Sequence, residues 1–204
     1  MQQGDHTSGI AEQFGFRTFK TLWNDPNNAQ LRQDRKDPHI LFPGDQVFIP
    51  DKQTKKQFAP TAKVTTFKLD ASKLTLNLKL QDVNGDAIAN NPVTISVEGS
   101  VVPPPTTDGD GKTSSDIKKT AKDGFLVVQD MQFPLKIGFL DPVDKQSGQI
   151  ARLNNLGYEA GPPDSVDAEA FESAVEEFQC DSKLPVNGTC DDATQAKLTE
   201  VHGC

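Results

Sequence analysis

Residues 74–80, Leu-Thr-Leu-Asn-Leu-Lys-Leu, place an apolar side chain at every second position. Because successive side chains of a β-strand point to opposite faces, this period of two predicts a strand with one buried face. The alternation is expected to begin at Thr66, with Phe67 and Leu69, and it returns over residues 92–97. The middle of the chain is therefore predicted to be built from strands.

Turn signals separate these runs. Asn84-Gly85 is typical of a hairpin turn, and Asp108-Gly109-Asp110-Gly111 predicts a second turn. With Asp116, these aspartates could suggest a calcium loop, but the full ligand spacing of such loops is missing, so an ordinary turn is expected. The triplet Pro103-Pro104-Pro105 is interpreted as a stiff loop. Several short strands with this punctuation favour an antiparallel β-sandwich of roughly the immunoglobulin kind.

Residues 80–95, LQDVNGDAIANNPVTI, and then 107–112, TDGDGK, are similar to invasin-type and other bacterial immunoglobulin-like repeats. Such repeats usually serve as spacers. The resemblance implies that residues 62–138 form a spacer domain with a sandwich fold.

The last third of the chain shows helical spacing instead. Residues 149–158 predict a short helix ended by Gly157, and residues 167–179 predict an amphipathic helix. A third helix is expected to begin near Asp192, with Ala193, Ala196 and Leu198 or Val201 as core candidates. In the second helix, apolar residues recur at i, i+3, i+4 and i+7 (Phe171, Ala174, Val175, Phe178), and glutamates face outward (Glu169, Glu172, Glu176, Glu177).

This segment resembles the bacterial peptidoglycan-binding domain that accompanies many wall hydrolases. The residues that carry the resemblance are Leu153, Leu156-Gly157-Tyr158, Gly161, Asp164, Ala174-Val175, Phe178-Gln179, Leu184, Val186, Gly188, Thr194 and Leu198. It implies a three-helix bundle over residues 139–204 that binds the cell wall.

The first fifty residues predict a small α/β unit. Gly4 to Ser8 form a turn whose polar side chains can cap the next helix, in which Ile10, Ala11 and Phe14 recur at helical spacing. A second apolar set predicts another helix: Phe19, Leu22 and Trp23. After a turn at Pro38–Asp45, residues 46–50 predict a strand stopped by proline.

The order Gly4-Asp5-His6-Thr7-Ser8-Gly9-Ile10-Ala11, then Pro38 to Pro50 with Pro43-Gly44-Asp45 inside it, resembles the LysM domain, a module that binds N-acetylglucosamine-containing glycans. The resemblance covers residues 1–51 and implies a βααβ fold with sugar held between two turns. On this chain the implied glycan-binding residues are Gly4, Asp5, His6, Thr7, Ser8, Pro38, His39, Ile40 and Leu41.

The connection in this unit has its own resemblance. Residues 24–32, Asn-Asp-Pro-Asn-Asn-Ala-Gln-Leu-Arg, lie ahead of Pro43-Gly44-Asp45 in a pattern similar to the LysM variant often seen beside contractile injection or type VI secretion loci. There such a module can dock protein, which implies a spike or effector protein as a partner. Residues 52–61 have lost apolar periodicity and are expected to be a linker.

Charge is unevenly distributed. The chain carries a formal net charge of −8, and residues 141–204 contribute 13 acidic and 4 basic side chains to it. With no Lys/Arg stripe, a nucleic-acid partner is not expected. The apolar runs are far shorter than the roughly 20 residues of a membrane-spanning helix, so membrane insertion is not expected either. Without a signal-peptide pattern, the protein is expected to be made in the cytoplasm and to act in the periplasm or envelope, or to be exported by a dedicated secretion system.

The residues that could carry catalysis do not form a known constellation. His6, His39 and His202 lie in different units without metal-ligand spacing, so no metal, no cofactor and no enzymatic activity are expected. His202-Gly203-Cys204 is similar to the His-Gly-Cys of L,D-transpeptidases but lacks the catalytic β-domain before it. The three cysteines are interpreted as buried apolar residues or as one local disulfide, Cys190–Cys204 or Cys180–Cys190.

The sequence thus predicts a multidomain α+β protein: a βααβ unit, an antiparallel β-sandwich and a three-helix bundle. The predicted function is non-catalytic binding of peptidoglycan or a chitooligosaccharide-like glycan, accessory to a contractile injection or type VI secretion apparatus. Two alternatives stay open: a protein-docking adaptor, and a regulator or inhibitor of a wall hydrolase whose acidic last third faces a basic enzyme.

Overall fold

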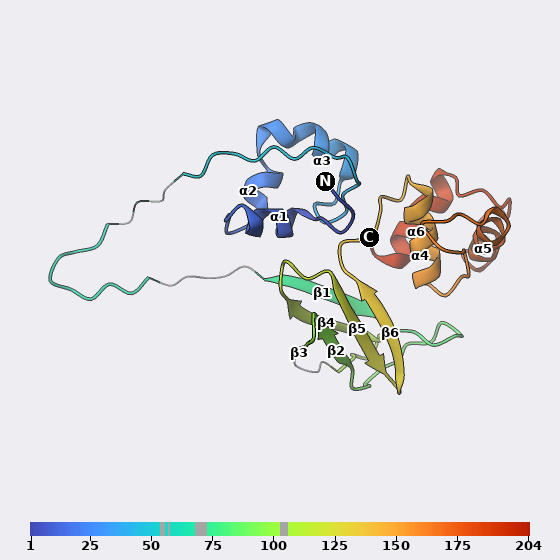
Figure 1. Ribbon diagram of the computed structural model, residues 1–204. Coiled ribbons are helices and arrows are strands. Elements are labelled where there is room, and N and C mark those ends of the chain that lie inside the picture. The colour runs from blue at the N-terminus through green and yellow to red at the C-terminus, as the bar shows by residue number, and fades with distance from the viewer. Residues whose placement is uncertain (54–55, 57, 68–72, 103–105) are drawn as a thin grey trace.

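The computed structural model describes residues 1–53, 56, 58–67, 73–102 and 106–204, and it is mixed α+β. Three groups of elements follow one another along the chain: helices, then two antiparallel sheets, then helices (Figure 1). Among the described residues, no helix is long and apolar enough to cross a bilayer. We refer to the groups as the N-terminal unit (1–50), the β unit (73–138) and the C-terminal unit (139–204).

The N-terminal unit contains α1 (Thr7–Gln13), α2 (Lys20–Trp23), the 3-10 helix η1 (Pro26–Asn28) and α3 (Ala29–Arg35). The helix expected after the first turn is confirmed, with Ile10 and Ala11 buried and the His6 side chain accepting a hydrogen bond from Gly9 N at its start. The core of the unit is completed by Leu22, Leu31 and Leu41.

The strand expected over residues 46–50 is absent from the described chain, so this part of the prediction was wrong. Backbone bonds join Met1 to Gly44 and Asp45 only, at the start of the segment. Further along, the Asn28 carboxamide pairs with both the N–H and the C=O of Phe48, in the place where a neighbouring strand would pair. Residues 46–50 are therefore extended without belonging to a sheet.

The β unit holds two antiparallel sheets. One pairs β1 (Leu74–Lys79) with β4 (Lys112–Ile117), and the other has the order β3 (Ser100–Val102), β2 (Thr94–Val97), β5 (Asp123–Val128), β6 (Met131–Lys136). The alternation that predicted β1 is confirmed: its leucines face inward and its polar residues outward. Both sheets contribute to one hydrophobic cluster, in which Val93, Ile95, Ile117, Leu126 and Val128 are buried.

Both predicted turns of this unit are present, and each is held by an aspartate. The Asp82 carboxylate accepts from the backbone N–H of Asn84 and Asp86, and the Asp108 carboxylate accepts from Asp110 and Lys112. These local bonds identify residues 108–111 as an Asx-type turn. Residues Leu69 and Pro103–Pro105, on which a strand and a stiff loop were predicted, lie outside the described residues.

The C-terminal unit contains α4 (Gln146–Asn155), α5 (Ala168–Asp181) and α6 (Asp192–His202). Asp167 and Asp191 cap α5 and α6 by accepting hydrogen bonds from backbone N–H groups of the first turn. The helices bury a common cluster, and the four predicted glutamates of α5 are exposed. The cluster comprises Ile150, Leu153, Ala160, Ala174, Val175, Phe178 and Leu198.

One part of the prediction for α6 was wrong. Leu198 is buried as expected, but Ala193, Ala196 and Val201 are exposed and Thr194 is buried in their place. The Thr194 hydroxyl donates to Asp191 and accepts from Gln179, so hydrogen bonds compensate its burial. All three cysteines are free thiols in the structure.

Candidate functional site

The two turns expected to hold a glycan lie side by side. The backbone N–H of Thr7 donates to the carbonyl oxygen of Pro38 at 3.3 Å, and the Thr7 hydroxyl donates to the same oxygen. Both turns therefore form one surface of the N-terminal unit.

Most of that surface is buried. His6, Thr7 and Ser8 expose 4%, 0% and 5% of their area. Gly4, Ile40 and Leu41 are also buried, while Asp5, Pro38 and His39 are partly exposed. A ligand approaching these turns in the structure would find few of the predicted atoms accessible.

The cover comes from the β unit and from the segment that leaves it. A side chain placed on Gly4 would begin 2.8 Å from the ring of Phe139, and one placed on Gly138 would begin 2.9 Å from the carbonyl oxygen of Gly4. Next to them, Gly9 packs against the carbonyl oxygen of Lys119. Glycine at positions 9 and 138 lets two backbones approach more closely than a Cβ would permit, and glycine at position 4 leaves room for the ring of Phe139.

Polar contacts hold the same interface. The Gln3 carboxamide donates to the carbonyl oxygen of Phe139 at 2.9 Å. The Lys119 ammonium group, with a side chain only 10% exposed, lies 3.0 Å from the Glu12 carboxylate. The N-terminal unit therefore docks on the β unit through the face that carries the predicted turns.

Two histidines of this face are held in the neutral form. Burial lowers the pKa of His6 to about 4, and the charge of His39 acts in the same direction. Burial also lowers the pKa of His39. The rings lie 5.9 Å apart, and His39 Nδ1 is a buried atom without a hydrogen-bond partner in the described chain.

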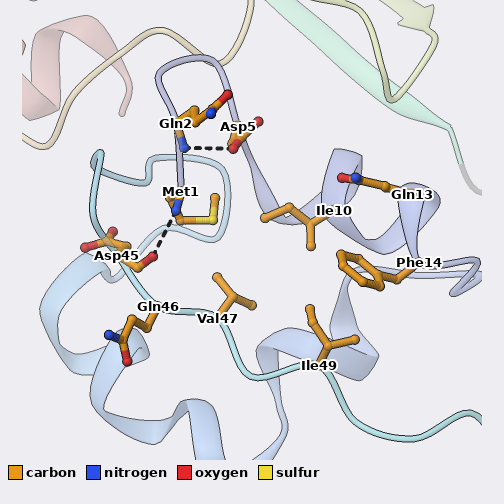
Figure 2. Close-up of a pocket in the computed structure, with 10 residues that line it drawn as sticks. All are labelled: Met1, Gln2, Asp5, Ile10, Gln13, Phe14, Asp45, Gln46, Val47 and Ile49. Carbon is orange, nitrogen blue, oxygen red and sulfur yellow. Dashed lines mark hydrogen bonds between the residues drawn. The ribbon is translucent and has the colours of Figure 1, made fainter.

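Next to the covered face lies an open pocket of about 410 Å³ (Figure 2). Apolar side chains from α1, from the residue after it and from the extended segment 46–50 converge on it, namely Ile10, Phe14, Val47 and Ile49. Met1, whose terminal ammonium group donates to the carbonyl oxygen of Asp45, also lines it. Polar residues complete its wall: Gln2, Asp5, Gln13, Asp45 and Gln46. Of the nine residues implied by the LysM resemblance, only Asp5 lines this pocket. The sequence gave little indication of the other pocket residues. Phe14 follows the last turn of α1, and Val47 and Ile49 have the spacing of core positions in a strand.

A second feature that sequence reasoning missed is a polar centre inside the C-terminal unit. Gln179 is fully buried. Its carboxamide nitrogen donates to Asn187, Thr189 and Thr194 at 2.9 Å each, and its oxygen accepts from the backbone of Asn187 at 2.8 Å. One side chain thus fixes the loop between α5 and α6. In the sequence, Gln179 stands out only through the resemblance of Phe178-Gln179 to the peptidoglycan-binding domain.

The thiol–imidazole pair at the end of α6 does not have the electrostatics of an activated nucleophile. Cys204 Sγ lies 3.2 Å from His202 Nδ1. Burial raises the pKa of Cys204 and lowers that of His202 to about 4. Thiol and neutral imidazole are therefore favoured over thiolate and imidazolium. Among the residues that the structure describes, no group of three His, Cys, Asp or Glu side chains is placed to hold a metal ion.

Comparison with known proteins identifies part of the C-terminal unit. Residues 151–198 match the family described as "Putative peptidoglycan binding domain". The matched segment runs from α4 to α6 and includes Gln179 and the buried cluster around Phe178 except Ile150. No curated protein and no solved structure matches the chain. Residues 151–198 are thus similar to a peptidoglycan-binding domain, and this match supports a role of the chain in binding the cell wall.

Proposed function

We propose that the protein is a non-catalytic peptidoglycan-binding protein that works as an accessory of a contractile injection or type VI secretion apparatus. The peptidoglycan-binding domain at residues 151–198 is the observation that carries the cell-wall part of the proposal. The unactivated state of Cys204 and His202 supports the non-catalytic part. The LysM variant suggested by residues 24–32 supports the link to a secretion apparatus.

In this proposal the β unit is an immunoglobulin-like spacer. Its two antiparallel sheets share one core, which gives a stiff body between the two terminal units. The N-terminal unit is a LysM-like module with a second, weaker affinity for N-acetylglucosamine-containing glycan. Two weak sites on one polymer raise the overall avidity without any new contact.

Cosedimentation of the full chain with purified sacculi tests the wall-binding part. We expect retention at low and moderate salt, protection from hydrogen exchange within residues 151–198, and no release of soluble muropeptides over time. Absence of retention at low salt would contradict wall binding. Release of muropeptides would contradict a non-catalytic role.

A second candidate function is a protein-docking adaptor without glycan binding. The observation that favours it is the use of the predicted turns in a contact between units of the same chain, where Gly4 and Gly9 pack against Phe139 and Lys119. Copurification of the full chain with a purified spike or tip protein of a secretion apparatus, without retention on sacculi, would favour this candidate.

A further inference from the structure

The extended segment 46–50 has one occupied backbone edge and one open edge. On the occupied edge, the N–H and the C=O of Phe48 both bond to the Asn28 carboxamide. Successive backbone groups of an extended chain point to alternate sides, so those of Val47 and Ile49 point away from Asn28. In the described part of the chain, neither Val47 nor Ile49 has a backbone hydrogen bond, so this edge lacks a neighbouring strand.

The open edge continues a contact that already exists. Asp45 stands two residues before Val47, so its carbonyl group points to the same side. The carbonyl oxygen of Asp45 accepts from the Met1 ammonium group at 3.3 Å, and the carbonyl oxygen of Met1 accepts from Gly44 N at 3.2 Å. Met1 thus pairs with the start of the segment, and the pairing stops before Val47. A second extended backbone can continue it along residues 47–49.

The pocket of about 410 Å³ lies along this open edge (Figure 2). Its aliphatic wall consists of Ile10, Val47 and Ile49. The ring of Phe14, 45% exposed, stands at its rim. Because the side chains of a strand alternate between two faces, an added strand would place every second side chain against this wall. Branched apolar side chains fit these positions, since they pack well on a pleated surface.

The charged groups of the lining have partners within the chain. The lining contains one ammonium group, on Met1, and two carboxylates, Asp5 and Asp45. Arg35 Nε lies 2.7 Å from the Asp45 carboxylate, and the Lys122 ammonium group lies 3.5 Å from that of Asp5. The Met1 ammonium group has three N–H donors, and among the described residues it bonds only to Asp45. A carbonyl oxygen of a peptide backbone can accept from a remaining donor.

Three carboxamides complete the polar wall of the pocket. They belong to Gln2, Gln13 and Gln46, and none of them has a side-chain hydrogen bond in the described part of the chain. A carboxamide both donates and accepts, as a peptide group does. Backbone edge, ammonium group and carboxamides therefore all match the N–H and C=O groups of a polypeptide.

We propose that residues 45–49 and the pocket beside them bind an extended segment of a partner protein, which adds as a β-strand to the open edge. The segment has branched apolar side chains at every second position and pairs through its backbone with Val47 and Ile49. Its end near Met1 offers a carbonyl oxygen to the ammonium group. This inference goes beyond the proposed wall binding, which rests on residues 151–198.

The test uses the full chain and a capped, soluble peptide, acetyl-Lys-Thr-Val-Thr-Val-Thr-Lys-amide. Amide hydrogen exchange is measured with and without a saturating concentration of this peptide. Exchange at Val47 and Ile49 should slow by about tenfold or more, because both N–H groups gain an acceptor. Phe48 is the internal control, since its N–H already bonds to Asn28 and its exchange should change little.

Two methylated peptides test the backbone pairing without any change in the protein. One is N-methylated at both valines, and the other at the last two threonines. The N–H groups of alternate residues in a strand point to opposite edges, so only one of the two peptides loses the N–H groups that face the protein. That peptide should bind at least about tenfold more weakly, and the other should bind like the unmethylated peptide.

A protein variant tests the apolar part of the site. Phe14→Ala should weaken peptide binding by about fivefold, because the peptide loses the apolar contact with this ring. Phe58→Ala is the matched control, since Phe58 is exposed and does not line the pocket. Equal affinities of the two variants would contradict the placement of the peptide beside Phe14.

Other results would overturn the inference as a whole. They are equal binding of the two methylated peptides, and no peptide binding at millimolar concentration. Binding of an N-acetylglucosamine tetramer instead of the peptide, with amide shifts at residues 46–49, would assign the pocket to a glycan. Self-association in analytical ultracentrifugation, with slow exchange at Val47 and Ile49 in the absence of peptide, would assign the edge to a second copy of the chain. Retention on sacculi is measured separately, so none of these results decides the proposed wall binding.

Discussion

Single buried polar residues hold much of this molecule together. His6 caps α1 with its Nδ1 atom while exposing 4% of its area. From inside the C-terminal unit, Gln179 binds four groups of the loop between α5 and α6 and the hydroxyl of Thr194 in α6. Each side chain is satisfied locally, so burial costs little while the native state is intact, and removal leaves its partners without hydrogen bonds.

Stability of the N-terminal unit should depend on pH through His6. Its folded pKa of about 4 lies below the ordinary value of 6.5, so the unfolded state binds the extra proton between these values. The free energy of unfolding should therefore fall as pH decreases from about 6.5 to 4, by on the order of 3 kcal/mol. His6→Asn keeps a capping side chain and should flatten most of this slope. Urea denaturation followed by the fluorescence of Trp23, the single tryptophan, measures it.

If the free energy of unfolding of His6→Asn fell with decreasing pH as steeply as that of the unchanged protein, the result would contradict this prediction. The lowered pKa of His39 leaves a smaller dependence of the same sign in the variant. The His202→Asn variant is a suitable control, because that residue lies in the C-terminal unit and should not change the signal from Trp23.

Replacement of Gln179 by leucine should destabilise the C-terminal unit by about 2 kcal/mol, since several groups of the loop at residues 187–189 lose their partner. Tyr158, the single tyrosine, packs edge to face on Phe178 at 5.6 Å and reports on this unit. Its fluorescence in urea gives the shift in unfolding midpoint. Glu176→Gln, on the exposed face of α5, should leave the midpoint unchanged, and an equal effect of both variants would contradict the assignment.

At the scale of elements, short turns set the register of the β unit. The Asp108 carboxylate accepts two backbone N–H groups, from Asp110 and Lys112, at 2.9 and 2.8 Å. Lys112 is the first residue of β4, so this turn fixes where β4 begins to pair with β1. The Asp108 carboxylate is therefore bound by backbone N–H groups of its own turn. This agrees with an aspartate pattern that lacks the spacing of a calcium loop.

Replacing Asp108 with alanine should therefore destabilise the β unit by about 1 kcal/mol per lost bond. Asp108→Asn keeps an oxygen acceptor and should recover most of that loss. Amide exchange rates at Asp110 and Lys112 give the local readout, because both N–H groups lose their acceptor in the alanine variant. Equal exchange in all three proteins would show that the turn does not depend on the side chain.

Sequence periodicity predicted the elements in which one face is buried against a core and the other face is exposed. The leucines of β1 and the apolar stripe of α5 repeat at fixed spacing because each faces a core directly. The expected strand at 46–50 failed because a single side chain, Asn28, takes the backbone bonds of Phe48. The prediction of the buried face of α6 was wrong because Thr194, whose hydroxyl has two hydrogen-bond partners, is buried where alanines were expected.

For the whole molecule, periodicity carried no information on how the units meet. The contact of the N-terminal unit with the β unit and with Phe139, which follows it, uses two glycines, Gly4 and Gly138, and polar side chains such as Gln3 and Lys119. None of these residues belongs to an amphipathic pattern. The sequence could predict that the two turns of the candidate glycan site lie together. It could not predict that neighbouring segments bury them, or that an open pocket lies beside them.

Docking of the units should also affect the ionisation of His6. A side chain placed on Gly138 would begin 3.1 Å from the His6 ring, so the cover lies directly against it. Burial lowers the pKa of His6, the charge of Lys122 lowers it further, and a backbone hydrogen bond with Lys119 acts in the opposite direction. Removing two contacts of this cover, by Lys119→Ala with Phe139→Ala, should free the N-terminal unit and raise the pKa of His6 from about 4 toward 6.5. Lys118→Ala is the control, since Lys118 is exposed and makes no ion pair in the described chain.

Nuclear magnetic resonance titration of the His6 ring measures this pKa, and small-angle scattering reports in the same samples whether the units separate. A double variant that separates in scattering but keeps a His6 pKa near 4 would mean that the N-terminal unit buries this ring by itself. The predicted turns would then be closed to a glycan even in the freed unit. A rise in the His6 pKa together with new binding of an N-acetylglucosamine tetramer would instead show that docking alone covers the turns.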